Sequence, residues 1–243
     1  MRYTRCMGNV SGLQVLEGFL SSAECSALIA SINQYRTNNE VPLVSRPDPK
    51  RPLNYRVING EEIQTKLPVI QRLYDKLLPI AKSSTPENIV PLSNRTVGVN
   101  VNITAPGGSY RWHYDRNAVT AVLYLNEVNG GEIEAYPNYR ILLRKGKSSR
   151  RQSYLDRLLQ WDLVLRLFGK KITIPPKPGL LVVMRGDRCL HSVTPVTGDH
   201  ERICVVMSFD SADATFPQEQ ALDSYLYSSK EYAGKNDPNY SPQ

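Results

Sequence analysis

The residues with the clearest chemical potential are two histidines and an aspartate. Asp115 follows His113 by two positions, and residues i and i+2 of a β-strand point to the same face of a sheet. The imidazole and the carboxylate can therefore reach one ion from the same side. His191 lies much further along the chain, next to a predicted strand, and adds a second imidazole. Two imidazoles and one carboxylate form the facial ligand set of non-haem Fe(II) sites, which leaves coordination positions open for reactants.

A His-x-Asp pair also occurs without a metal, as a hydrogen-bonded pair at the surface or in the core. The chain has only three histidines, and the placement of His113 and His191 beside predicted strands favours the metal site. The third, His200, lies in a polar sequence that predicts an exposed turn. Asp187 is likewise expected in a turn rather than as a fourth ligand.

Short strands must position these ligands. Val97, Val99, Val101 and Ile103 alternate with polar residues, which predicts a half-buried strand beginning at Thr96. A turn over 126–131 is expected to close a hairpin between a strand over 119–125 and a strand over 132–136. Further strands are predicted over 12–17, 119–125, 132–136, 171–174, 180–184 and 203–209, and His113-x-Asp115 is expected on or beside a strand. This series, broken by Pro and Gly turns, predicts a mainly β fold with flanking helices, a double-stranded β-helix (jelly roll) over about 96–210.

Two helices are predicted before the jelly roll. Ser21 and Glu24 fit a capping box at the start of a helix over 22–35. A second helix is expected over 61–82, interrupted near Pro68 and ending near Pro79. The Pro-rich stretch 42–52 predicts a loop between them. These helices are expected to support the jelly roll from outside.

The composition fits one globular domain. The chain has 243 residues, of which 41% are hydrophobic and 22% charged, so disordered and collagen-like proteins are excluded. We expect a single domain over 1–229 and a flexible tail over 230–243. Four cysteines without a Cys-x-x-Cys pair indicate neither a zinc site nor a disulfide framework. The absence of a long apolar span or a signal-peptide pattern favours a cytoplasmic protein.

The net charge of +7 is concentrated in one segment. Ten Lys or Arg and only two acidic residues lie between Asn138 and Lys171. A helix is predicted over 153–168 of this basic insertion. The insertion could cover the active site and meet an anionic substrate, bind an acidic carrier protein or a membrane surface, or simply pack on the barrel beside a solvated loop. Nucleic acid is not expected, because exposed aromatic residues are not interleaved with the basic ones.

Several linked motifs resemble the 2-oxoglutarate/Fe(II) oxygenases, in particular the prolyl-4-hydroxylase-like branch. The similarity covers most of 13–210 apart from the basic insertion. The matching motifs are Phe19-Leu-Ser-x-x-Glu-Cys25, Tyr110-x-x-His113-x-Asp115, 119–126, Gly130-Gly-Glu132 with Tyr136-Pro137, 178–183, 191–195 and 202–210.

The resemblance implies a ligand set and two cosubstrates. It implies that His113, Asp115 and His191 bind Fe(II), and that 2-oxoglutarate and O₂ are cosubstrates. The far carboxylate of 2-oxoglutarate needs a cation and a hydroxyl group, which Arg202 and Tyr124 can provide. Tyr110 is expected beside the iron, on the cosubstrate or substrate side. A purely structural role remains the alternative for each tyrosine, because the chain has fourteen.

Two features depart from the prolyl hydroxylases. Cys204 stands where relatives with this arginine have Ser or Thr, and the stretch between His191 and Arg202 is slightly longer. Both weaken the assignment of a prolyl substrate. Asp115 occupies the coordination position that related halogenases leave free for chloride, so halogenation is not expected.

The expected activity is the Fe(II)- and 2-oxoglutarate-dependent hydroxylation, desaturation or cyclisation of a small molecule, with release of succinate and CO₂. An amino acid or a natural-product intermediate is the expected substrate type, either anionic or attached to a carrier protein. A peptidyl or prolyl hydroxylase is one alternative. The other is a non-catalytic jelly-roll binding protein that recruits an acidic partner through the basic insertion. The joint presence of the iron ligands and Arg202 argues against that alternative.

Overall fold

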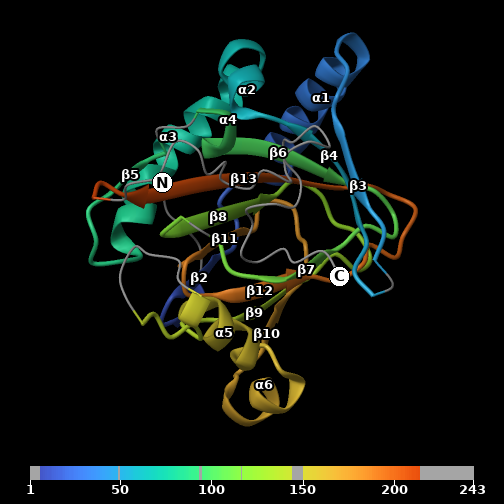
Figure 1. Ribbon diagram of the computed structural model, residues 1–243. Helices are drawn as coiled ribbons and strands as arrows, with labels where there is room; N and C mark the ends of the chain where they lie inside the picture. Colours follow the sequence, from blue (N-terminus) through green and yellow to red (C-terminus); the bar gives the residue numbers. More distant parts are fainter. Residues whose placement is uncertain (1–5, 49, 93–94, 116, 144–149, 214–243) are drawn as a thin grey trace.

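Two β-sheets face each other across the middle of the molecule (Figure 1). The computed structural model describes residues 6–48, 50–92, 95–115, 117–143 and 150–213. The predicted tail over 230–243 lies outside these residues. The mainly β jelly-roll architecture with flanking helices is confirmed. No helix in the described part of the chain is long and apolar enough to cross a membrane.

The larger sheet has nine strands, and its described pairings are all antiparallel. Its order is β1-β2-β11-β8-β13-β6-β4-β3, and β5 pairs with β13 beside this path. The strands are β1 (Cys6–Val10), β2 (Leu13–Leu16), β3 (Leu43–Arg46), β4 (Leu53–Ile58), β5 (Ile89–Pro91), β6 (Val99–Thr104), β8 (Val119–Tyr124), β11 (Leu181–Met184) and β13 (Arg202–Ser211).

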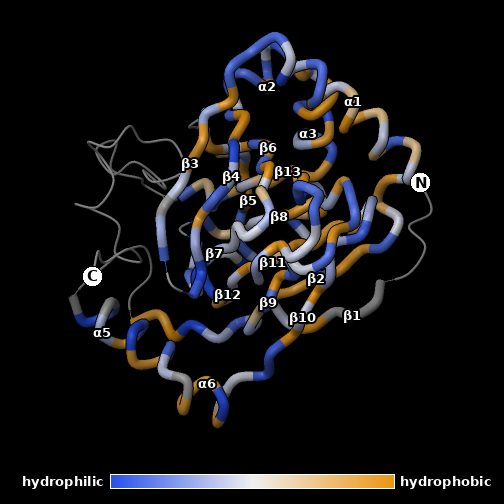
Figure 2. Tube along the Cα trace, turned by 90° about the vertical axis from the view of Figure 1, so that its right-hand side faces the viewer, coloured by the Kyte–Doolittle hydropathy of each residue, from blue (hydrophilic) through white to orange (hydrophobic). Residues whose placement is uncertain are grey.

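The smaller sheet has four antiparallel strands in the order β10-β9-β12-β7. These strands are β7 (Tyr110–His113), β9 (Ile133–Tyr136), β10 (Ile172–Ile174) and β12 (Leu190–Val193). Six helices are described: α1 (Ser22–Asn38), α2 (Gly60–Lys66), α3 (Pro68–Ser83), α4 (Arg95–Gly98), α5 (Arg150–Leu159) and α6 (Asp162–Phe168). The first four lie over the outer face of the larger sheet, and α5 and α6 lie beyond the smaller sheet (Figures 1 and 2).

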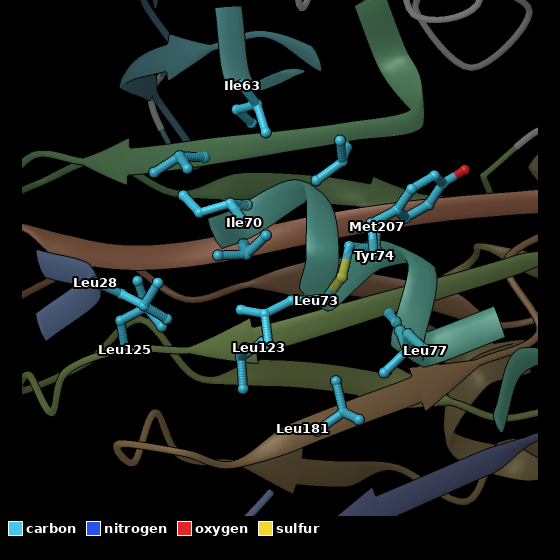
Figure 3. Close-up of a cluster of buried hydrophobic side chains, with 14 of the residues drawn as sticks. Leu28, Ile63, Ile70, Leu73, Tyr74, Leu77, Leu123, Leu125, Leu181 and Met207 are labelled. Atoms are coloured by element: carbon cyan, nitrogen blue, oxygen red, sulfur yellow. The ribbon is translucent and has the colours of Figure 1, made fainter. Parts of the chain in front are cut away.

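The larger sheet is buried on both faces. Alternate residues of β8, β11 and β13 pack against the helices, as Leu123, Leu181 and Met207 do with Leu77 of α3 (Figure 3). The residues between them point toward the smaller sheet and form a second apolar cluster, which includes Val122. Two-sided burial explains why these strands are almost continuously apolar rather than alternating with polar residues.

The N-terminal helices follow the sequence prediction in outline. The Ser21 side chain accepts a hydrogen bond from the Glu24 backbone, and the Glu24 side chain accepts one from the Ser21 backbone, so the capping box is confirmed. The helix break at Pro68 is also confirmed. The predicted end near Pro79 is wrong, because α3 continues to Ser83. Pro79 is on the exposed side of α3, where water can bond to the carbonyl that loses its helical donor.

Three other strand predictions need correction. The strand expected from Thr96 begins at Val99 after α4, and its six residues are all buried because its polar face lines the space between the sheets. The predicted loop over 42–52 contains the edge strand β3, which pairs only with β4. The stretch 126–131 does not close a hairpin. It crosses between the sheets, since β8 pairs with β11 and β13 whereas β9 pairs with β10 and β12.

The basic insertion is only partly described, and its predicted single helix is two helices. α5 and α6 are separated at Gln160 and Trp161. That a single domain spans residues 1–229 stays a prediction.

Replacing Leu77 by alanine should destabilise the fold strongly. Leu77 is fully buried between α3 and the larger sheet. The loss of a buried leucine side chain of this kind costs about 2–5 kcal/mol. Urea unfolding should show a lower midpoint for Leu77→Ala, while Lys76→Ala, on the exposed side of the same helix, should unfold like the parent. Equal midpoints for the two variants would contradict the packing described.

Candidate active site

Two neighbouring strands of the smaller sheet bring the histidines together. β7 and β12 are antiparallel, and His113 is directly opposite His191 in their register. Cross-strand partners of this kind point to the same face. The two imidazole ring centroids are accordingly 4.2 Å apart.

Asp115 completes the group from the turn that follows β7. Its Oδ1 lies 3.4 Å from His113 Nε2 and 3.6 Å from His191 Nε2. The three potential ligand atoms lie within 4.8 Å of one another, as a site for one metal ion requires. The structure thus brings together the three residues that the sequence singled out.

Backbone carbonyls orient both imidazoles. His113 Nδ1 is 2.8 Å from the Arg111 carbonyl oxygen, and His191 Nδ1 is 3.0 Å from that of Cys189. A carbonyl can only accept, so each Nδ1 carries the proton and each Nε2 presents a lone pair. Burial lowers the pKa of His191 to about 4, against the opposing effect of Asp115, so this imidazole is neutral at neutral pH.

A chain of hydrogen bonds holds the Asp115 carboxylate. Asn117 Nδ2 donates to Thr120 Oγ1 at 2.9 Å, and the Thr120 hydroxyl donates to Asp115 Oδ2 at 2.5 Å. Burial would raise the pKa of Asp115, but His191, His113 and Thr120 outweigh it and lower the pKa to about 2. The carboxylate is therefore ionised, with Oδ1 directed to the histidines.

Gly186 permits this close arrangement. Its carbonyl oxygen accepts a hydrogen bond from the Asp115 backbone N–H at 3.0 Å. A Cβ at this position would lie 2.7 Å from Thr120 Oγ1, 2.8 Å from the Asn117 carbonyl oxygen and 2.9 Å from Asp115 Cβ. A larger residue would therefore displace the carboxylate or the hydroxyl group that orients it.

Arg202 and Tyr124 lie on the opposite wall, in the larger sheet. Arg202 begins β13, Tyr124 ends β8, and the Arg202 guanidinium carbon is 4.9 Å from the centroid of the Tyr124 ring. Arg202 is only 2% exposed, yet it has no ion pair with a described carboxylate. Its Nε and the Tyr124 hydroxyl also have no hydrogen-bond partner in the described part of the chain. Arg202 lines the same pocket as the three-residue group.

Tyr110 is placed between these two regions. Its hydroxyl accepts a hydrogen bond from Asn102 Nδ2 at 3.1 Å, and its ring centroid is 6.4 Å from that of His113. Cys204 also lines the pocket, two residues after Arg202 on the same face of β13. All six predicted site residues therefore surround one pocket, or lie directly at its wall.

The two residues predicted to lie elsewhere do so. His200 is exposed in the turn before β13. Asp187 lies 3.8 Å from both Arg185 and Arg188, and it is not a member of the three-residue group.

The residues that support the ligands were not among the site residues predicted from the sequence. Thr120 was included in a buried strand without a role, although a polar residue inside an apolar strand signals a buried hydrogen bond. The half-buried pattern of their strand predicts an exposed polar face for Asn100 and Asn102, but both are buried and line the pocket. Asn117 and Gly186 had no sequence signal that separated them from ordinary turn residues.

Comparison with known proteins identifies the core. Residues 99–209 match the family model of the 2OG-Fe(II) oxygenase superfamily. The jelly-roll core belongs to this superfamily. Its members use Fe(II), 2-oxoglutarate and O₂, so the chain is a 2-oxoglutarate-dependent Fe(II) dioxygenase. A search of curated proteins found no match.

Solved oxygenase structures share the fold at low sequence identity. The carbocyclase SnoK of nogalamycin biosynthesis is 16% identical, with a TM-score of 0.64 over 85% of this chain and 82% of its own. The epimerase SnoN, solved with Fe³⁺, α-ketoglutarate and nogalamycin RO, is 14% identical, with a TM-score of 0.64 over 96% and 91%. A prolyl-4-hydroxylase from Pseudomonas putida is 20% identical, with a TM-score of 0.52 over 83% and 94%.

The residues present in this oxygenase fit the two cofactors of its superfamily. Two imidazoles and one carboxylate suit Fe(II). The buried guanidinium of Arg202 suits the distal carboxylate of 2-oxoglutarate, because a buried charge is costly unless it is paired.

Removal of the Thr120 hydroxyl should weaken metal binding. Groups that orient metal ligands contribute about 10–100-fold to metal affinity. Thr120→Val keeps the side-chain shape but leaves Asp115 Oδ2 without its donor, so we expect weaker binding within this range in an anaerobic Fe(II) or Co(II) titration. Thr173→Val, on the exposed side of β10, is the matched control. Parent-like affinity of Thr120→Val would show that the hydroxyl does not orient the ligand.

Proposed function

We propose that His113, Asp115 and His191 bind Fe(II), that Arg202 and Tyr124 bind 2-oxoglutarate, and that the enzyme oxidises a small molecule. The observation that carries this proposal is that a metal-ligand group and a buried, unpaired arginine line one pocket from opposite sheets. The reaction would release succinate and CO₂ and hydroxylate, desaturate or cyclise the substrate.

The three ligands have complementary tasks. Nε2 of His113 and of His191 would each donate a lone pair, and Asp115 Oδ1 would supply negative charge. They come from one side only, so positions on the opposite side stay available for reactants. Bound Fe(II) supplies the activation of O₂ that couples decarboxylation of 2-oxoglutarate to substrate oxidation.

Arg202 and Tyr124 would orient the cosubstrate. A guanidinium can donate two parallel hydrogen bonds to one carboxylate, which fixes the orientation of the acid. Burial raises the pKa of Tyr124, so its hydroxyl keeps its proton and can donate to the same carboxylate. Tyr110, held by Asn102, would contact the cosubstrate or the substrate near the metal.

A small-molecule substrate is favoured over a peptide. SnoK and SnoN, both named from nogalamycin biosynthesis, have TM-scores of 0.64, whereas the Pseudomonas prolyl-4-hydroxylase has 0.52. At the end of the pocket away from Arg202, Leu92, Val97 and Val206 supply apolar walls, and Asn100 and Ser208 supply polar groups. This lining suits a substrate with a mostly apolar body and a few hydrogen-bonding groups.

Succinate formation tests the activity and the substrate class together. We expect 2-oxoglutarate- and Fe(II)-dependent succinate release that rises with an accepted small molecule in a screen of amino acids, polycyclic natural products, carrier-bound acyl groups and Pro-rich peptides. His113→Ala and His191→Ala should abolish turnover, while His200→Ala should leave it unchanged. Stimulation by Pro-rich peptides alone would contradict the substrate class, and turnover by both ligand variants would contradict the metal assignment.

Substitution of Arg202 should affect the cosubstrate but not the metal. Arg202→Lys keeps the charge but loses the two-pronged geometry, and Arg202→Met loses both. The concentration of 2-oxoglutarate needed for half-maximal turnover should rise about 10-fold or more in Arg202→Lys, and further in Arg202→Met, because a charged hydrogen bond contributes roughly 1.5–3 kcal/mol. Fe(II) affinity should match the parent in a direct titration. An unchanged 2-oxoglutarate requirement would exclude Arg202 from the binding site.

A further inference from the structure

The outer side of α6 exposes large apolar side chains. Trp161, just before α6, is 63% exposed, and Leu163 and Leu167 within it are each 67% exposed. Leu163 and Leu167 are four residues apart and share one side of the helix. We call these three residues the α6 patch. Single exposed apolar residues are common, but a group of three on one short projection indicates a binding surface.

The inner side of the same insertion is already packed. Leu165 is only 6% exposed and lies in a cluster with Tyr136 and Leu190 of the smaller sheet and with Tyr114, which follows β7. The α6 patch is therefore not the face that holds the insertion on the barrel.

A buried ion pair anchors the other helix of the insertion. Arg140 Nη2 lies 2.6 Å from Asp156 Oδ2 on α5, and the Arg140 guanidinium carbon lies 4.7 Å from the centre of the Tyr114 ring. Asp156 is 6% exposed, so its negative charge faces inward.

Positive charge surrounds the patch on the outside. Arg157 on α5, Arg166 on α6 and Lys170 just after it are all exposed. Arg166 and Lys170 form no ion pair with any residue in the described ranges. The outer surface of α5 and α6 thus combines large apolar side chains with cations, whereas Asp156 of α5 is buried.

We propose that α5 and α6 bind the surface of an anionic lipid membrane. The apolar side chains would enter the boundary between head groups and acyl chains, and the cations would pair with anionic head groups. Trp and Leu are typical inserting residues, and apolar insertion combined with basic residues supplies the two contributions that stable membrane attachment needs. This inference concerns the insertion and is independent of the proposed activity.

The shape of this surface favours a membrane over a protein. α6 forms the outermost projection on its side of the molecule (Figures 1 and 2). A stable protein partner would need a matching surface of about 800 Å² on each side, but a membrane accepts a short convex projection without shape complementarity. A second copy of this chain would bring its own cations against those of the first, which disfavours self-association through this face.

Vesicle binding tests the proposal. The full chain should sediment with phosphatidylcholine vesicles that contain phosphatidylglycerol, and much less with phosphatidylcholine alone. Arg166→Gln and Lys170→Gln should each lower the affinity about 5-fold, from roughly 1 kcal/mol per cation. Leu163→Ala with Leu167→Ala should also reduce binding. Leu43→Ala, which removes a 54% exposed side chain on β3, and Lys82→Gln on α3 are the matched controls and should bind like the parent.

Tryptophan fluorescence reports insertion directly, because the chain has only two tryptophans. In Trp112→Phe, the emission maximum of the remaining Trp161 should shift to shorter wavelength when anionic vesicles are added. In Trp161→Phe, the emission maximum of Trp112 should not shift. Urea unfolding would verify that each variant is folded.

The proposal is overturned if the parent does not bind anionic vesicles at low salt, or if the leucine variant binds as well as the parent. Binding to poly-L-glutamate without vesicle binding would indicate an acidic protein partner, and dimerisation lost in the leucine variant would indicate self-association; either would also overturn it.

Discussion

Burial of the larger sheet on both faces is the constraint on which the rest of the molecule depends. A strand that is covered on both sides must divide its side chains between two environments. In β13, Ile203, Val205 and Met207 pack under the helices, while Arg202 and Cys204 face the space between the sheets. The helices α1–α3 are needed to cover one face, and the smaller sheet is needed to enclose the other. The same strand therefore contributes to the hydrophobic core and to the candidate active site.

The site has different kinds of support on its two walls. On the smaller sheet, cross-strand pairing places His113 against His191, and backbone carbonyls fix both rings. On the larger sheet, Thr120 reaches across to orient Asp115. The two histidines are thus held by paired strands, and Asp115, which follows β7, is oriented by a hydrogen bond from a strand of the other sheet; such support keeps a metal site preorganised.

Buried charges separate structural roles from binding roles in this molecule. Glu134 of β9 is buried, but Arg51 and Lys171 lie 2.7 Å and 2.8 Å from its two oxygens, so its charge is satisfied within the protein. Arg202 is buried to a greater degree and lacks such a partner in the described part of the chain. Because unpaired buried charge is unfavourable, the contrast supports an anionic ligand at Arg202 and a structural role for Glu134.

The sequence alone indicated the fold class and the three metal-ligand candidates, because strand periodicity and rare residue types are local properties that a linear pattern retains, and the resemblance of its motifs to a known family indicated Arg202. Tertiary structure decided the partners of these residues. The pairing of β7 with β12, the crossing at 126–131 between sheets, and the approach of Thr120 to Asp115 past Gly186 all depend on contacts between distant segments. The buried setting of Asn100 and Asn102 was also invisible in the sequence, since a period of two shows that a strand has two different faces but not that its polar face lines an enclosed pocket.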